Sequence, residues 1–335
     1  MKFFARAFSF AFLSFFSCFA QAQDFKGKTI NIVVGFTPGG GYDIYARLLA
    51  RVFGANLPGS PNVVVQNMPG AGGLVAMNYI YNVAPKDGTT VGIVLPSVGI
   101  YQKLYPGEVH YDVQKVNWIG RITSNTPIQY TWHTSEFRTV EDMRSRQVLV
   151  AGTGTTSPSM VVPLILNAFA DTRFKVVSGY PGNSESRLAL ERGEVEAISD
   201  NWSTVKVDSN GWLRDKKLIV TLRYGNKRHP ELAEVPAIAE LVKTEDQRRI
   251  LAFFASADEI GVSVVAPPFL EPPVVSSLRE AFLTSMRDAA LIDEARRLKL
   301  DLDILPGNEL QKISSDALAT PAPLIAQFKK IIDNK

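Results

Sequence analysis

A glycine-rich loop between an apolar run and a helical pattern is the first place where this sequence could bind a ligand. Residues 35–53, "GFTPGGGYDIYARLLARVF", contain three consecutive glycines, Gly39, Gly40 and Gly41. Glycines leave backbone N–H groups exposed, and the start of a helix adds unpaired donors and the positive end of its dipole. These features favour a small anion such as a carboxylate. A tight turn that needs glycine for a positive φ explains the loop equally well.

Neither of the common nucleotide motifs with a glycine loop is present. A P-loop requires Lys followed by Ser or Thr after its last glycine, whereas Gly41 and Tyr42 follow Gly40 here. A dinucleotide fingerprint requires a glycine three residues after Gly41, and Ile44 stands there. If the loop binds a ligand, that ligand is therefore a small anion and not a nucleotide.

A second loop of similar character lies farther along the chain. Residues 152–159, "GTGTTSPS", stand between an apolar run and a helical pattern, and they combine hydroxyl side chains with exposed amides. Two such loops that faced each other across a cleft would form a clamp with polar walls. Two unrelated turns between strands and helices remain the alternative.

The residues that could support catalysis form no recognisable catalytic or metal-binding pattern. The three histidines are His110, His133 and His229, and none belongs to a zinc motif such as H-E-x-x-H. Asp43 at a helix start suits capping or ligand binding as well as base catalysis, and Asp200 follows the run "VEAIS", where α/β proteins place ligand contacts. We therefore predict no enzymatic activity, no metal and no cofactor.

Strands and helices are expected to alternate around these loops. The apolar runs "TINIVVGF", "QVLVA" and "FKVVS" are each followed by a loop with Gly, Ser or Thr and then by a helical pattern. After the second loop, Pro163 is expected in the first turn of a helix, which then begins close to Val161. The alternation predicts an α/β fold with largely parallel or mixed sheets.

The first 22 residues have the pattern of a secretory signal peptide. Lys2 and Arg6 precede an apolar run at residues 7–20, and small residues mark a cleavage site after Ala22. This run is shorter than the roughly 20 residues of a membrane span, so a soluble periplasmic protein is predicted. Cleavage removes the only cysteine, Cys18, and two of the 36 basic residues. The remaining Lys and Arg residues nearly balance the 33 acidic residues. Such a charge balance gives no field for binding nucleic acid.

The remaining chain is long enough for two domains. About 310 residues exceed what a single hydrophobic core usually serves. Two extended segments, residues 128–134 and 260–273, are predicted to cross between the domains. The predicted division is a signal peptide at 1–22, a first lobe of 23–127 plus 262–335, and a second lobe of 128–261.

Several motifs, in this order and spacing, resemble those of one receptor family. They are "FTPGGGYD" from Phe36, "VVVQNMPGAGG" from Val63, "APKDG" from Ala84, "GTTSPS" from Gly154 and "GEVEAISDN" from Gly193. Over nearly its whole mature length the chain is similar to the extracytoplasmic receptors of tripartite tricarboxylate transporters, also called Bug receptors. The resemblance implies a Venus flytrap, the type II-like fold of a two-lobe periplasmic binding protein, with two crossing strands and a cleft between α/β lobes.

The resemblance also implies a function without chemistry. Such a receptor captures a small organic carboxylate in the interlobe cleft, partly through ordered water, and delivers it to a membrane complex of one large and one small subunit. A ligand sensor that docks onto a signalling protein would use the same closed surface. An exported hydrolase or lyase with an aspartate base is the enzymatic alternative. The receptor is expected to act as a monomer.

Carried onto this chain, the resemblance places the ligand between the two loops. Tyr42 stands where many relatives have Ser or Thr before the loop aspartate, and Tyr180, Pro181 and Gly182 replace a Tyr-Lys-Gly turn. The lost lysine and the added ring favour a mono- or dicarboxylate that is less charged than citrate or is aromatic. The predicted ligand-binding residues are Thr37, Gly39, Gly40, Gly41, Tyr42, Asp43, Asn67, Gly72, Ser97, Thr155, Thr156, Ser157, Tyr180 and Asp200.

Overall fold

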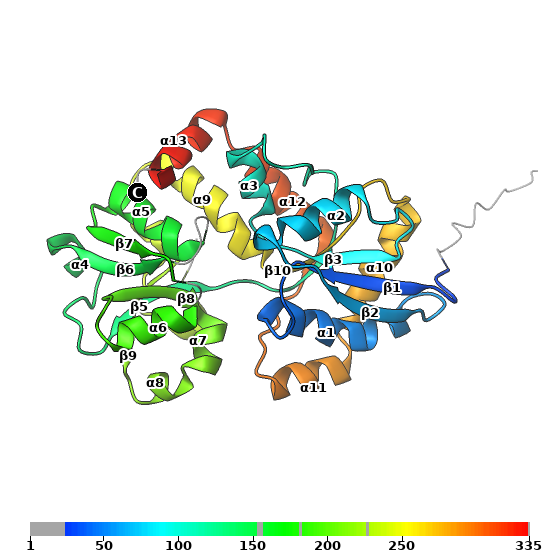
Figure 1. The fold of residues 1–335 in the computed structure, drawn as a ribbon, viewed down its shortest axis with the longest axis horizontal. Coiled ribbons are helices and arrows are strands. Elements are labelled where there is room, and N and C mark those ends of the chain that lie inside the picture. Colours follow the sequence, from blue (N-terminus) through cyan, green and yellow to red (C-terminus); the bar gives the residue numbers. More distant parts are fainter. Residues whose placement is uncertain (1–23, 153–156, 181–182, 226–227, 334–335) are drawn as a thin grey trace, which may run out of the picture.

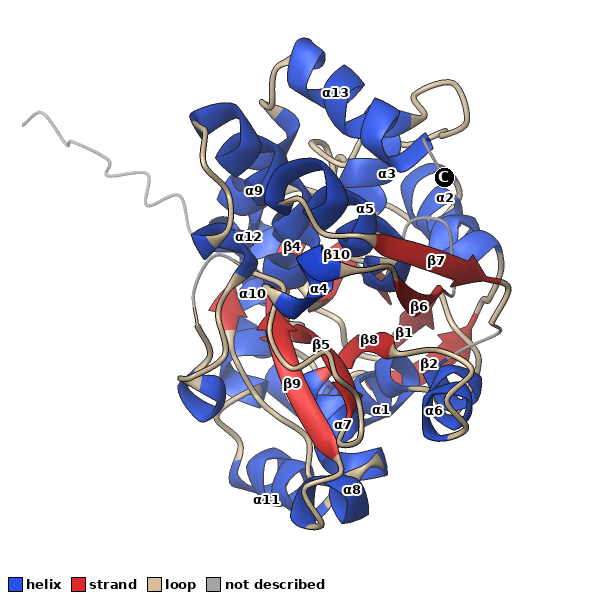
Figure 2. Ribbon diagram, turned by 90° about the vertical axis from the view of Figure 1, so that its left-hand side faces the viewer, coloured by secondary structure: helices blue, strands red, loops and turns tan. Residues whose placement is uncertain are grey.

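The computed structural model describes residues 24–152, 157–180, 183–225 and 228–333. Within these residues the chain forms two β-sheets, each covered by helices on both faces (Figures 1 and 2). In spatial order the larger sheet is β11-β4-β10-β3-β1-β2, and the smaller sheet is β7-β6-β8-β5-β9. The predicted α/β fold with alternating strands and helices is confirmed.

The strands of both sheets are short and mostly buried. They are β1 (Thr29–Val34), β2 (Asn62–Asn67), β3 (Thr90–Ile93), β4 (Asn117–Thr123), β5 (Pro127–Trp132), β6 (Val148–Gly152), β7 (Phe174–Ser178), β8 (Ala197–Asn201), β9 (Leu218–Arg223), β10 (Val262–Ala266) and β11 (Leu305–Pro306).

Helices connect and cover the strands. They are α1 (Gly41–Phe53), α2 (Leu74–Asn82), α3 (Val98–Leu104), α4 (Asp142–Ser145), α5 (Pro158–Ala170), α6 (Asn183–Glu191), α7 (Trp202–Asp208), α8 (Asn210–Arg214), α9 (Glu245–Ile260), α10 (Pro272–Ser285), α11 (Ala289–Arg297), α12 (Gly307–Leu318) and α13 (Ala322–Asp333). Among these described helices, none combines the length and the apolar character that a membrane span requires.

The first sheet has a parallel half that carries the glycine loop. β1 pairs in parallel with β2 and β3, so that Val34 lies opposite both Asn67 and Ile93. β10 runs antiparallel between β3 and β4. Because the carboxyl ends of parallel strands meet at one edge of a sheet, the loop that follows β1 lies beside the end of β2.

Helices on both faces make the strands of the first sheet apolar on both sides. Ile32 and Val34 pack in one core with α1, α10 and α11, whereas Val33 packs in another core with α2 and α12. All three of these side chains are fully buried. This pattern is typical of a sheet that is covered on both faces.

The second sheet is built in the same way. Val148 and Val150 of β6 pack with α5, α9 and α13, and Ile128 and Tyr130 of β5 pack with α6 and α7 on the other face. β6 is parallel to β7 and β8, and β5 is antiparallel to β8 and β9. β6 therefore ends at the same edge of the sheet as β8, whose last residues are Asp200 and Asn201.

α5 begins earlier than the sequence predicts. Ser157 is its N-cap and Pro158 its first residue, so Pro163 lies inside the helix. A proline at the first position is pre-organised for a helix, so Pro158 sets the start of α5. An inner proline removes one N–H and its ring crowds the carbonyl four residues earlier, but α5 accommodates Pro163 in its interior. The expectation that Pro163 belongs to the first turn is wrong.

The chain passes between the two sheets at three places. Residues 124–126 join β4 to β5, and Gly261 joins α9 to β10. Residues 319–321 join α12, which packs on the first sheet, to α13, which packs against α5 and α9 (Figure 1). The predicted lobe limits, after residues 127 and 261, lie beside the first two passages and stay a prediction.

Candidate functional site

A cavity of about 400 Å³ lies between the two lobes and is bordered by the start of α1 and the start of α5. α1 contributes Gly41 and Tyr42 from the first lobe, and the start of α5 contributes Ser157 and Ser159 from the second. Thr155 and Thr156 lie outside the described residues. The structure thus brings the described parts of both loops to one cavity.

Two of the three loop glycines are not required by the fold. Gly39 has a positive φ of 81°, which a glycine adopts at little cost. Gly40 has a φ of −78° and Gly41 is the first residue of α1, so neither needs a special backbone conformation. A Cβ at Gly40 would meet only the Thr37 carbonyl at 3.6 Å, and one at Gly41 would meet nothing within 4 Å. Glycines at these two positions keep the start of α1 open to an approaching group.

Asp43 holds the loop in place. Its Oδ2 accepts from the Gly39 backbone N–H and from Arg47 Nε, both at 2.8 Å. Its Oδ1 accepts from Asn67 Nδ2 at 2.8 Å and from Arg47 Nη2 at 3.0 Å. The hydrogen bonds from Arg47, with those from Gly39 and Asn67, lower the pKa of Asp43 to about 2. Both oxygens are occupied, so the geometry makes Asp43 a positioning residue for the loop.

Tyr42 forms a wall of the cavity. Its ring stacks on Phe36, with ring centroids 4.2 Å apart and an interplanar angle of 14°. Burial raises the pKa of Tyr42 to about 12, although a hydrogen bond with Asn125 lowers it. The hydroxyl is therefore neutral at physiological pH, and the ring offers the cavity an apolar edge.

An ion pair orders the opposite wall. Arg187 Nη1 donates to Asp200 Oδ2 over 2.7 Å, and the Asn201 backbone N–H and the Asn183 amide donate to Oδ1. Asp200 is buried, and burial raises its pKa although Arg187 and the donated hydrogen bonds act in the opposite direction. The donors that surround Asp200 fix one rotamer of a cavity-lining side chain.

Several predicted site residues do not line the cavity, and Gly39, Gly40 and Asp43 are among them. Asn67 ends β2 and donates to the Phe36 carbonyl at 3.0 Å, so it supports the glycine loop. Thr37 is exposed, and Ser97 precedes α3. Gly72 lies in the turn Ala71–Gly73, and Tyr180 packs in the core beneath α6 and α7.

The sequence did not single out the residues at the junction of the lobes. Asn125 in the first passage and Asp258 near the end of α9 both line the cavity. Ser203 and Thr204 of α7 line it as well. The two segments predicted to cross between domains begin within a few residues of Asn125 and Asp258. Their proximity to these crossings is the one sequence feature that could have pointed to both residues.

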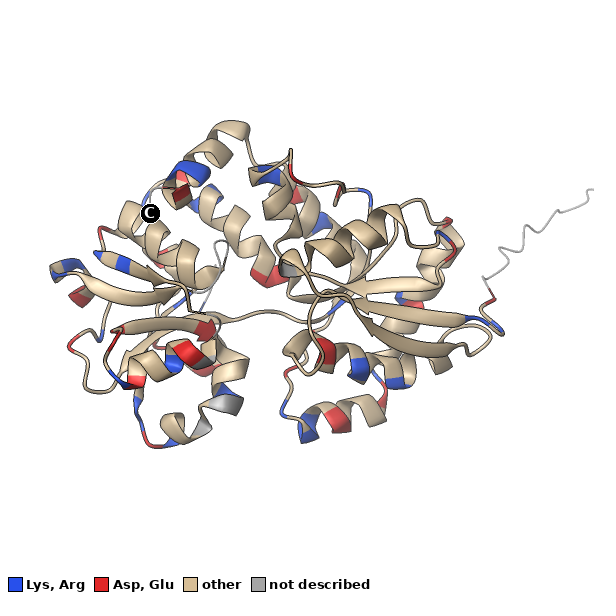
Figure 3. Ribbon diagram, viewed as in Figure 1, with Lys and Arg blue, Asp and Glu red and all other residues tan. Residues whose placement is uncertain are grey.

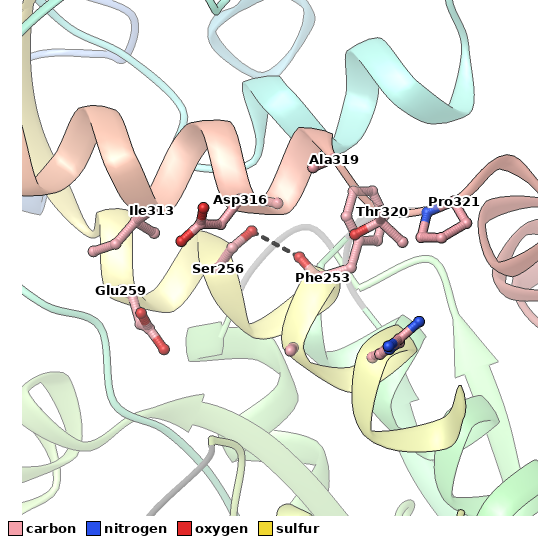
Figure 4. Close-up of a pocket in the computed structure, with 11 residues that line it drawn as sticks. Phe253, Ser256, Glu259, Ile313, Asp316, Ala319, Thr320 and Pro321 are labelled. Carbon is pink, nitrogen blue, oxygen red and sulfur yellow. Dashed lines mark hydrogen bonds between the residues drawn. The ribbon is translucent and has the colours of Figure 1, made fainter. Parts of the chain in front are cut away.

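A second cavity, of about 420 Å³, lies between α9 and α12 (Figure 4). Phe253, Ser256 and Glu259 of α9 face Ile313 and Asp316 of α12 across it. None of the predicted site residues lines this cavity. The cavity between the loops is therefore the candidate site.

The chain matches the family model described as "Tripartite tricarboxylate transporter family receptor" over residues 46–329. It belongs to this receptor family. The match spans both lobes, from α1 to α13. The family suggested by the glycine motifs is therefore confirmed.

One curated relative of the receptor is similar along most of its length. The "UPF0065 protein in gbd 5'region" of Cupriavidus necator is 27% identical over 278 residues, which cover 80% of this receptor and 77% of that protein.

Solved structures share the fold. A TctC solute binding protein from Polaromonas, without ligand, has a TM-score of 0.69 at 19% identity and covers 92% of this receptor and 98% of that chain. A Rhodopseudomonas palustris protein with adipate has a TM-score of 0.66 at 20% identity and covers 92% and 99%. The two-lobe binding-protein fold is thereby confirmed, and both family and fold are those of substrate-binding receptors.

Proposed function

We propose that the receptor captures a small organic carboxylate in the interlobe cavity and delivers it, in the periplasm, to the large and small membrane subunits of a tripartite tricarboxylate transporter. The observation that carries this proposal is the pair of helix starts at the cavity. Gly41 borders it at the start of α1, where an added Cβ would meet nothing within 4 Å, and Ser157 and Ser159 border it at the start of α5. Helix starts favour negative charge on a ligand.

The cavity offers an anion polar groups without a fixed positive charge. Among its described lining residues there is no Lys or Arg, and charged side chains are spread over both lobes (Figure 3). A carboxylate would therefore exchange its water shell for amides and hydroxyls. Micromolar binding requires about 8 kcal/mol, which several charge-assisted hydrogen bonds and some apolar contact supply after costs. Tyr42 provides apolar contact for a short aliphatic or aromatic acid.

The geometry of Asp43 argues against this residue as the base of the enzymatic alternative. A general base must be able to accept a proton from the substrate. Both oxygens of Asp43 already accept hydrogen bonds, and its pKa of about 2 makes it a weak base. We therefore propose binding and release of an unchanged acid.

A thermal-shift screen tests the proposal directly. Protein stripped of carried-over cargo is mixed with malate, adipate, benzoate and citrate, and with glucose and putrescine as neutral and cationic compounds. An acid at a hundredfold excess over its Kd adds about 2.7 kcal/mol of stability, so the Tm rises by several degrees. Stabilisation by glucose or putrescine, with none by any acid, would overturn the carboxylate assignment.

A substitution at Gly41 tests the position of the site, because Gly41 lines the cavity. Leu at this position should lower affinity for the best acid at least tenfold, because its side chain fills the space at the start of α1. The fold should persist, since a Cβ there would meet nothing within 4 Å. Gly107→Leu is the matched control, because a Cβ at Gly107 also meets nothing within 4 Å and Gly107 does not line the cavity. Equal affinities in the two variants would rule out the proposed site.

A further inference from the structure

Asp258 is a buried carboxyl group at the junction of the two lobes. It lies near the end of α9, lines the cavity and is 8% exposed. Its backbone carbonyl accepts from the Asn125 backbone N–H at 3.0 Å, which fixes α9 against the first passage. Its side-chain Oδ2 is buried and accepts no hydrogen bond from any described residue. A buried polar atom without a partner is costly, and functional sites are where such atoms are retained.

None of the described charged and titratable groups around Asp258 forms a direct ion pair with its carboxyl group. Arg223 of β9 acts on it from a distance and lowers its pKa, whereas Glu259, its neighbour on α9, raises it. Tyr42 of α1 also faces it. Arg121 of β4 borders the adjoining crevice, where its guanidinium pairs with Asp303 at 2.9 Å. Burial is the largest influence and raises the pKa of Asp258 well above its ordinary value.

The two aspartates of the cavity differ in what holds them. Asp200 has Arg187 at 2.7 Å and two further donors. No such donor comes to Asp258 from the described residues, and an isolated carboxylate in a buried site is disfavoured against the neutral acid. A neutral carboxyl group carries one O–H donor, and rotation about χ2 presents either oxygen to the cavity.

We propose that Asp258 is a ligand-contacting residue, and that as a neutral carboxylic acid it donates its proton in a hydrogen bond to the carboxylate held in the interlobe cavity. This inference rests on the proposed function. It adds one donor to a cavity that has no Lys or Arg among its described lining residues, and it makes ligand capture depend on pH. No bond is broken in the ligand, because the proton stays shared between the two carboxyl groups.

The sign of the pH effect follows from linkage. A bound anion beside Asp258 favours the neutral acid, so binding takes up a proton wherever the empty receptor is ionised. Affinity should therefore fall as the pH rises, by up to tenfold per pH unit. Tyr42, with its pKa of about 12, stays neutral near neutral pH and does not contribute to the pH dependence of binding.

Isothermal titration calorimetry of the whole receptor tests the proposal. The probe is whichever of malate, adipate and benzoate gives the largest thermal shift, titrated from about pH 6.5 to 8.5, where carboxylic acids of this kind are ionised. The affinity of the wild type should fall as the pH rises. Titrations in buffers of different ionisation enthalpy should show that binding takes up protons. Asp258→Asn, whose amide donates at every pH, should bind with a flat pH profile and no proton uptake.

Asp200→Asn serves as the comparison, because it alters the other cavity aspartate. Its affinity is expected to drop while its pH slope matches the wild type. A wild-type slope in Asp258→Asn would overturn the inference, and so would loss of binding by that variant at every pH, since the ionised carboxylate would then be the required form. If the wild type binds none of the acids, the proposed function itself fails.

Urea unfolding separates a binding effect from a folding defect. The pKa of Asp258 is higher in the folded state than in the unfolded chain, so wild-type stability falls as the pH rises between these two values. Asp258→Asn removes that fall. The variant should be at least as stable as the wild type at pH 8.

Discussion

At the scale of single residues, the motif around the glycine loop groups several positions without showing what each of them contributes to the loop. The sequence points to Gly39, Gly40 and Asp43 together. The structure gives them different tasks: Gly39 supplies a positive φ, Gly40 leaves space, and Asp43 binds the loop. The partners of Asp43 come from α1 and from the end of β2, and that proximity arises only when the sheet forms.

Replacing Asp43 by Ala should destabilise the receptor. Gly39, Arg47 and Asn67, which together donate four hydrogen bonds to Asp43, would lose their acceptor, at a cost of about 1–3 kcal/mol. The pKa of Asp43 is about 2 when folded and about 3.9 in an unfolded chain, so its contribution is present above about pH 4 and is lost as the pH falls toward 2. Urea unfolding at pH 7 and in acid measures both effects.

An exposed ion pair provides the control for this prediction. Asp316→Asn removes the partner of Lys312 on α12, where both side chains are largely exposed. Such pairs contribute little, so no measurable change is expected. Equal losses of stability in the two variants would contradict the role given to Asp43.

At the scale of elements, the period of apolar residues predicts the first strand and helix of each lobe well. β1, α1, β6 and β7 lie where the apolar runs and helical patterns place them. The start of α5 is different, because Pro158 already fixes a helical φ and Pro163 is tolerated inside the helix. Close contacts between a helix and a strand were not predictable either, since they depend on residues far apart in the chain.

One such contact predicts the effect of a small substitution. A Cβ at Gly120 in β4 would overlap the ring of Phe282 on α10, which is fully buried. Gly120→Ala should therefore cost about 1–3 kcal/mol through overpacking, measured by urea unfolding. Gly99→Ala in α3 is the control, because its nearest atom is 3.5 Å away and Ala is the better helix former. A Gly120→Ala protein as stable as the wild type would show that α10 moves freely over the sheet.

At the scale of the whole molecule, composition and motif order predict two lobes, but not the residues at their junction. Asn125 and Asp258 belong to segments more than a hundred residues apart, and nothing in either segment alone marks it as part of a site. Lys206 Nζ of α7 donates to Asp301 Oδ1 at 3.2 Å, and Asp301 lies between two residues that pack on the core of the first lobe. The sequence does not predict this contact between the lobes.

The contact between Lys206 and Asp301 should bias the receptor toward its closed form. Lys206→Met removes this contact and the one with Glu231, so the empty protein should open. Because a ligand closes the lobes only by binding the closed form better, affinity should also fall several-fold. Small-angle X-ray scattering should show a larger radius of gyration than for the control Lys175→Met on β7. A radius of gyration equal to that of the control would show that the contact between Lys206 and Asp301 does not favour the closed form.

The third passage of the chain has a practical consequence. Because α13 crosses to the second lobe, the chain begins its described part beside β1 in one lobe and finishes it against α5 in the other (Figure 1). Fluorescent proteins fused at the two ends would therefore be attached to different lobes. Energy transfer between them would report lobe closure in real time, so the fusion protein would serve as a biosensor for whatever acid the receptor carries, with no substitution in the receptor itself.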